Sequence, residues 1–157
     1  MDTNAGSEER MMGCIIVLYN KICASISSLQ TLRCDCPVNL QFCVTDNSTD
    51  SLVKSLNKSW CSRNQVMYID MMGNQGLSKA YNRALDLVDG QWDWIVLLDD
   101  DTAITAEYFI RLKQYSVMYP DTDIFMPLIY DQKGLLSPCL MRHGRFRRLS
   151  GRDMDGS

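Results

Sequence analysis

The 157-residue sequence contains no hydrophobic run close to the roughly 20 residues that span a bilayer, and its polar, acidic start does not resemble a secretory signal peptide. It has a single histidine, His143, which leaves no room for a histidine metal cage or a Ser-His-Asp triad. A net charge of -3 gives no electrostatic reason to expect a nucleic-acid partner. Neither GxxxxGK[ST] nor GxGxxG occurs, which disfavours P-loop and dinucleotide-binding folds. The remaining composition, 46% hydrophobic and 22% charged residues, is that of an ordinary globular domain.

The seven cysteines also lack the pattern of a metal site or a disulfide framework. Cys14 and Cys43 fall inside predicted strands, where we expect small core side chains. Cys34-Asp35-Cys36 is the one close pair, and it lacks the spacing and the second pair of a zinc site. Together with the missing leader, this usage predicts reduced thiols in a cytoplasmic protein.

Strand and helix patterns alternate along most of the chain. Apolar, β-branched runs predict strands at residues 14–18, 40–45, 66–69, 94–98 and 124–126. Apolar residues at helical spacing predict helices at 22–32, 51–58 and 77–88, and another around 109–115. This order is typical of an α/β domain with a mostly parallel sheet covered on both faces. We expect residues 1–10 to be a disordered lead-in (with Met11 or Met12 as a candidate start), residues 11–130 to form one domain, and residues 131–157 to be a tail or the start of another region.

Polar side chains follow each of the first four predicted strands. Open α/β sheets bind ligands at the carboxyl ends of their strands, so these residues are candidates for a site. They are Tyr19 and Asn20 after the first strand, Asp46, Asn47 and Ser48 after the second, Asp70 and Asn74 after the third, and Asp99, Asp100 and Asp101 after the fourth. Three of these strand ends carry a carboxylate, which would repel a bare phosphate and suggests that a divalent cation mediates binding.

The three adjacent aspartates are the strongest single feature. Like charges so close together repel one another, which makes a structural role for all three improbable. In an extended segment alternate residues point the same way, so Asp99 and Asp101 are expected to share a face. Carboxylate oxygens are ligands that Mg²⁺ and Mn²⁺ prefer. The alternative is that an aspartate caps the following helix, but Thr102 and Thr105 are available for that role.

Four segments in this order resemble the family 2 glycosyltransferases of the GT-A fold. They are IIVLYN at 15–20, VTDNSTD at 44–50, GNQGLSKAYNRAL at 73–85 and WIVLLDDDT at 94–102. The sequence is most similar to the rhamnosyltransferase-like branch. The resemblance covers about residues 11–130 and implies a Rossmann-like GT-A sandwich that is truncated here, because the acceptor-binding half would follow.

The resemblance also implies roles for the matching residues. Tyr19 and Asn20 would line the nucleotide pocket, and Asp46 would hydrogen-bond the base edge, with Asn47 and Ser48 shaping that loop. Donor contacts would come from Asn74, Gly76, Lys79 and Asp100. Asp99 and Asp101 would form the DXD metal motif, with Asp99 toward the ribose or sugar and Asp101 toward the metal. The donor would be a UDP- or dTDP-sugar and the acceptor a glycan or a lipid-linked molecule of polysaccharide synthesis.

The chemistry implied is displacement at the anomeric carbon, in an inverting reaction assisted by Mg²⁺ or Mn²⁺. A carboxylate base would deprotonate the acceptor. The only carboxylates after residue 130 are Asp131, Asp153 and Asp155, and none of them matches the expected base. We therefore leave the catalytic base unassigned.

Three alternatives remain beside this interpretation. One is a truncated, non-catalytic nucleotide-sugar-binding domain. Another is a phosphotransferase of the haloacid dehalogenase type, although Ala103 stands where its DxDx[TV] motif needs Thr or Val. A sugar nucleotidyltransferase would need a Gly-rich loop in place of Tyr19-Asn20-Lys21.

A basic cluster near the C-terminus has two interpretations. It comprises Arg142, His143, Arg145, Arg147 and Arg148 around Phe146. It is either a contact with acceptor phosphates or an anionic membrane surface, at the inner face of the membrane, or a solvated, poorly ordered tail. The sequence does not indicate the oligomeric state.

Overall fold

The computed structural model describes residues 11–30, 38–132, 134–137, 139–142 and 145–148. The chain divides into two compact units, Met1–Lys113 and Gln114–Ser157. The first unit contains four strands, β1 (Met12–Leu18), β2 (Leu40–Asp46), β3 (Met67–Asp70) and β4 (Trp94–Asp99). With them are a short 3-10 helix η1 (Cys23–Ser25) and the helices α2 (Ser51–Arg63) and α3 (Leu77–Val88), while α4 (Ala106–Met118) runs across the boundary of the two units.

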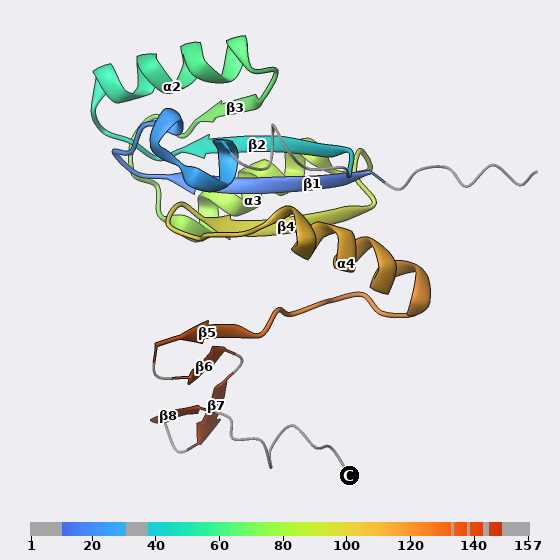
Figure 1. Ribbon diagram of the computed structural model, residues 1–157. Coiled ribbons are helices and arrows are strands. Elements are labelled where there is room, and N and C mark those ends of the chain that lie inside the picture. Colours follow the sequence, from blue (N-terminus) through green and yellow to red (C-terminus); the bar gives the residue numbers. More distant parts are fainter. Residues whose placement is uncertain (1–10, 31–37, 133, 138, 143–144, 149–157) are drawn as a thin grey trace, which may run out of the picture. The chain divides into compact units, whose positions relative to one another are not determined.

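The four strands form one all-parallel sheet in the order β3-β2-β1-β4. Figure 1 shows β1 and β2 side by side with their arrowheads at one edge. Because β2 and β3 continue from β1 in one direction and β4 lies on its other side, the strand order reverses between β1 and β4. Such a reversal is the point where open α/β sheets bind ligands. The α/β class and the mostly parallel, Rossmann-like sheet predicted from the sequence are confirmed.

Strand alternation divides the core between the two faces of the sheet. On one face Ile15, Cys43 and Ile69 pack with Ala84 and Val88 of α3. The other face carries α2 and η1, and the Asn57 side chain of α2 reaches both η1 and the end of β2. All seven residues of β1 are buried, which agrees with a strand covered on both sides.

One glycine of β1 is required by its neighbour on the sheet. A Cβ built on Gly13 would lie 1.7 Å from the Cε3 atom of Trp92, so only hydrogen leaves room for the indole ring. Trp92 in turn packs against the α3 side of the core. The pair closes the amino end of the sheet beside the start of β4.

Two predicted elements are wrong. The helix expected at 22–32 is interrupted: η1 ends at Ser25 and Ile26 is extended (φ -83°, ψ 110°) before the helical residues 27–30. The amide of Cys23 is bound by the side chain of Asn57, so a tertiary contact holds the start of this segment. Residues 31–37, which include Cys34 and Cys36, lie outside the described residues.

The strand expected at 124–126 does not form either. Ile124 and Met126 are 76% and 69% exposed, so their apolar run has no sheet to cover. Strand structure begins later, at β5 (Ile129–Asp131), which pairs antiparallel with β6 (Gly134–Ser137). β7 (Cys139–Arg142) and β8 (Arg145–Arg148) form a second antiparallel pair. The backbone register of this pair sets Arg142 opposite Arg145, in the segment where the sequence offered a poorly ordered tail as one alternative.

No helix in the described part of the chain is long and apolar enough to span a membrane.

Candidate functional site

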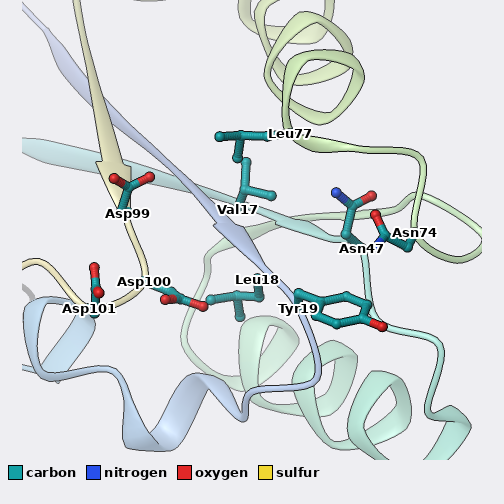
Figure 2. A pocket seen from close by; sticks show the side chains of 9 residues that line it. All are labelled: Val17, Leu18, Tyr19, Asn47, Asn74, Leu77, Asp99, Asp100 and Asp101. Atoms are coloured by element: carbon teal, nitrogen blue, oxygen red, sulfur yellow. The ribbon is translucent and has the colours of Figure 1, made fainter. Parts of the chain in front are cut away.

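A cavity of about 410 Å³ opens at the carboxyl ends of β1 and β4, at the reversal of strand order. Figure 2 shows the three aspartates at one end and Tyr19, Asn47 and Asn74 at the other. Apolar side chains lie between the two ends, namely Val17, Leu18 and Leu77. The cavity therefore offers an acidic end and a neutral end with one aromatic ring and two amides.

The acidic end is a turn, not the extended segment that the sequence analysis assumed. β4 ends at Asp99, and the amide of Thr102 donates to the Asp99 carbonyl at 3.2 Å, which closes the turn. All three aspartates nevertheless line the cavity, because the turn bends around its rim. Capping of α4 does not explain them: that helix begins at Ala106, and the carbonyl of Thr105 accepts from the amide of Tyr108 at its start.

Two neighbouring side chains bind these carboxylates. Lys21 Nζ lies 2.5 Å from Asp100 Oδ1 in an ion pair. The Tyr81 hydroxyl donates to the Leu98 carbonyl at 3.2 Å and is 3.4 Å from Asp99 Oδ1. Burial, and then the charge of Asp99, raise the pKa of Tyr81 to about 12, so its phenol stays protonated and available as a donor. Asp101 has neither of these partners.

Asp46, expected at the base edge, is fully buried and is absent from the cavity lining. Its Oδ1 accepts from the amide of Ser48 at 2.9 Å, and its Oδ2 accepts from Asn57 Nδ2 at 2.9 Å and from the Tyr68 hydroxyl at 3.1 Å. Burial, followed by the charge of Asp46, raises the pKa of Tyr68 well above its usual range. The carboxylate thus joins the end of β2 to α2 and β3.

Asn20 ties the loop after β1 to the loop after β2. Its backbone is left-handed (φ 50°), and its Oδ1 accepts from the amides of Thr49 at 3.0 Å and Asp50 at 3.3 Å. Its own amide donates to the hydroxyl of buried Ser48 at 2.8 Å. Asp50 in turn caps α2. Asn20 therefore stands next to Tyr19 as a clamp on the rim and is not itself part of the lining.

The loop before α3 is shaped by side-chain amides. Asn47, nearly buried, donates to the Gly76 carbonyl and accepts from the Gln75 amide, both at 3.2 Å. Asn74 Oδ1 accepts from the Gly76 amide at 3.0 Å. Gly76 has φ 86°, a conformation that costs any other residue, and it precedes the first residue of α3. Lys79 lies exposed in the first turn of α3, outside the lining.

Asp70, at the far strand of the same edge, is also outside the lining. Its Oδ1 pairs with Lys54 Nζ at 2.8 Å and accepts from the amide of Met72 at 2.7 Å. Burial acts to raise the pKa of Asp70, but the hydrogen bonds and charge of these partners outweigh it and hold the pKa below its usual value. The carboxylates at this edge of the sheet thus fall into two groups. Asp99, Asp100 and Asp101 line the cavity, whereas Asp46 and Asp70 are bound by other residues of the protein.

The carboxylate oxygens at the turn suit a hard divalent cation whose remaining coordination positions are filled by a bound ligand. Within the described ranges no three or more His, Cys, Asp or Glu side chains gather into a cage. Asp99 and Asp101 both face the cavity, whereas Asp100 is paired with Lys21. Cations such as Mg²⁺ commonly take one or two protein carboxylates and fill the other positions with phosphate oxygens and water, and these two residues fit that pattern.

Four residues that shape the site were not predicted: Lys21, Asn57, Tyr68 and Tyr81. A signal existed for Asn57, because it falls on the helical stripe of Val53, Trp60 and Cys61, and a polar residue on an apolar stripe marks a buried hydrogen-bond network. The side chains of Asp131 and of the basic cluster, and all of His143, Asp153 and Asp155, lie outside the described part of the molecule.

Comparison with known proteins agrees with this geometry. No curated protein and no solved structure matches the chain. The model of the family described as "Glycosyl transferase family 2" matches residues 14–146, which include every residue that lines the cavity. The chain therefore belongs to glycosyltransferase family 2.

Proposed function

We propose that the cavity binds a nucleoside-diphosphate sugar, and that the protein transfers this sugar to a glycan or lipid-linked acceptor. UDP- and dTDP-sugars are the proposed donors, and the reaction is proposed to invert the anomeric carbon. The observation that supports this best is the chemical division of the cavity, acidic at one end and aromatic with amides at the other. A donor of this class has the same division, with a flat base at one end and a diphosphate at the other.

The neutral end would take the base. Tyr19 lines the cavity and is 49% exposed, so its ring has a face free for stacking. Asn47 and Asn74 stand beside it, with their orientation fixed by the Gly76 backbone. Asp46, being buried and fully engaged, would act by holding the loop that carries Asn47. Lys79 would reach the donor only from outside the present lining.

The acidic end would take the diphosphate together with Mg²⁺ or Mn²⁺. Asp99 and Asp101 would hold the cation, which would supply Lewis-acid neutralisation of the leaving diphosphate. Tyr81 would keep Asp99 oriented, since its phenol remains a donor through the physiological range. No described side chain is assigned as the acceptor base.

Titration calorimetry with UDP, dTDP and GDP, each with and without Mn²⁺, tests the donor site. We expect UDP or dTDP to bind, and Mn²⁺ to strengthen that binding at least about tenfold, because two carboxylates otherwise face the diphosphate. Asp101→Ala should remove the Mn²⁺ effect. Asp86→Ala, which deletes an exposed carboxylate on α3, is the matched control and should behave like the wild type. Failure of all three nucleotides to bind, or an unchanged Mn²⁺ effect in Asp101→Ala, would refute the proposal.

Transfer itself is tested separately. Incubation with UDP- and dTDP-sugars and an acceptor extract should release nucleoside diphosphate faster than the Asp101→Ala variant does. Binding without any release would favour the non-catalytic domain instead. Phosphatase activity without nucleotide binding would favour the dehalogenase-type alternative, which no observed feature supports better. Attachment to a membrane surface through the basic cluster, in a cytoplasmic protein, is part of the proposal, and a sedimentation assay with anionic vesicles would test it.

A further inference from the structure

Lys21 brings a positive charge to the rim of an otherwise acidic cavity end. Its Nζ is 2.5 Å from Asp100 Oδ1, and the pair joins the loop after β1 to the turn after β4. These two loops flank the cavity on either side of the strand-order reversal. The lysine side chain is 45% exposed, so solvent and ligands can reach it.

The backbone of Lys21 is fixed by a buried hydrogen-bond network. Asn57, with no exposed surface, donates from Nδ2 to the Lys21 carbonyl at 2.9 Å and accepts from the Cys23 amide at 2.8 Å. The same Nδ2 donates to Asp46 Oδ2 at 2.9 Å. The left-handed residue Asn20 precedes Lys21 and is clamped to the next loop. The backbone is therefore held on both sides of Lys21, which is not itself a lining residue but whose side chain reaches Asp100 in the lining.

Stability alone does not account for this arrangement. An exposed ion pair contributes little to folding, since both charges are well solvated when apart. The ammonium group has three donors, and Asp100 Oδ1 takes one of them. A lysine whose remaining donors lie beside a cavity-lining carboxylate is suited to an anionic group of the ligand, and the diphosphate is that group in the proposed donor.

We propose that Lys21 is a specificity-determining residue that contacts the donor diphosphate and so selects nucleoside diphosphates over monophosphates, with Asp100 holding the lysine in place when the cavity is empty. This inference rests on the proposed function. It assigns to Asp100 an orienting role and leaves Asp99 and Asp101 for the cation. In this inference the buried hydrogen bonds of Asp46 and Asn57 position the backbone of Lys21.

Calorimetry with UDP, UMP and uridine, in the presence of Mn²⁺, tests the selection. In Lys21→Gln we expect UDP binding to weaken about tenfold and uridine binding to change less than about twofold, since a charge-assisted hydrogen bond to phosphate is lost. Lys21→Arg should restore much of the preference for UDP. Lys58→Gln, which removes an exposed lysine of α2 that does not pair with Asp100, is the matched control and should keep the wild-type preference.

A second test titrates Mn²⁺ without nucleotide and measures free Mn²⁺ by electron paramagnetic resonance. Here Lys21→Gln should strengthen binding, whereas it should weaken the binding of UDP. Removing the ammonium leaves Asp100 without its neutralising partner, so Lys21→Gln should bind Mn²⁺ about threefold more tightly. Damage to the fold would weaken both ligands, which separates it from the expected result. A UDP-to-UMP ratio unchanged in Lys21→Gln would overturn the inference and leave the proposed function intact. Wild-type protein that binds no nucleoside diphosphate would overturn both.

Discussion

Asn57 donates a hydrogen bond of 2.9 Å to the carboxylate of Asp46, and neither side chain has any exposed surface. The bond connects α2 to the end of β2 beneath the cavity. Through its other contacts Asn57 also holds the carbonyl of Lys21 and the amide of Cys23. One amide side chain thus connects the loops that follow β1 and β2.

Asn57→Ala should therefore be costly. The substitution removes a hydrogen bond from each of Asp46, Lys21 and Cys23 and leaves a void at a side chain with no exposed surface, so we expect the free energy of unfolding to fall by about 2–4 kcal/mol. Urea denaturation followed by circular dichroism measures it. Asn82→Ala, at an exposed position of α3, is the control and should change stability by less than about 0.5 kcal/mol. A loss for Asn57→Ala as small as that of the control would contradict the network.

Gly13→Ala tests the contact with Trp92. The added methyl would overlap the indole ring, and overpacking of this kind destabilises a protein by about 1–3 kcal/mol. Trp92→Leu removes the ring and should make Gly13→Ala less harmful. In a double-mutant cycle the combined loss should be smaller than the sum of the two single losses. Strict additivity would show that the two residues do not meet.

Tyr81 should ionise late in an alkaline titration. Its folded pKa of about 12 lies above the usual value of 10.0, so the stabilisation of the neutral phenol is complete below pH 10 and is lost as the pH rises toward 12. Ultraviolet absorbance of tyrosinate should show this step in the wild type and not in Tyr81→Phe. Asp99→Asn removes the neighbouring charge and should lower the pKa of Tyr81 part of the way, since burial, the larger cause, remains. An unshifted step in Asp99→Asn would argue against the contact.

The buried thiols Cys14, Cys23, Cys43 and Cys61 should resist alkylation in the native state. Each has no exposed surface, and burial raises the pKa of Cys43 to about 11, which depletes the reactive thiolate. The hydrogen bond with Cys23, 3.8 Å away between sulfur atoms, and then burial raise the pKa of Cys61 as well. Mass spectrometry of peptides labelled with iodoacetamide should find these four cysteines modified only in denaturant. Labelling of Cys61 at the rate of an unfolded peptide would refute its burial.

Much of the fold follows from local patterns in the sequence. The runs that became β1, β2, β3 and β4 are continuous and apolar, the central strand β1 is buried along its whole length, and α3 carries a clear helical stripe. Asp99, Asp100 and Asp101, the strongest candidates in the sequence, do line a cavity, although their turn was taken for an extended segment. Strand-end position alone could not show which carboxylates face a ligand. Asp46 and Asp70 also follow predicted strands, as Asp99 does. Only the folded structure shows that Asp46 is bound by Asn57 and Asp70 by Lys54.

Long-range contacts also explain the remaining errors. The helical spacing after Lys21 does not reveal the extended residue Ile26, nor the bond from Cys23 to the side chain of Asn57, 34 positions later. The apolar residues at 124–126 stay exposed because no described strand pairs with them. Neither feature can be predicted from the local sequence pattern.

The clamp made by Asn20 has a kinetic consequence. Its side chain binds residues 29 and 30 positions later, and Asn57 reaches back 36 positions to Lys21. Contacts of such sequence separation form only after the intervening chain has closed into a loop, and parallel pairing of β1 with β2 is the step that closes it. The cavity therefore has no local precursor. During refolding, the proposed nucleotide binding should appear at the rate of sheet formation, and any substitution that slows the pairing of β1 with β2 should delay both events equally.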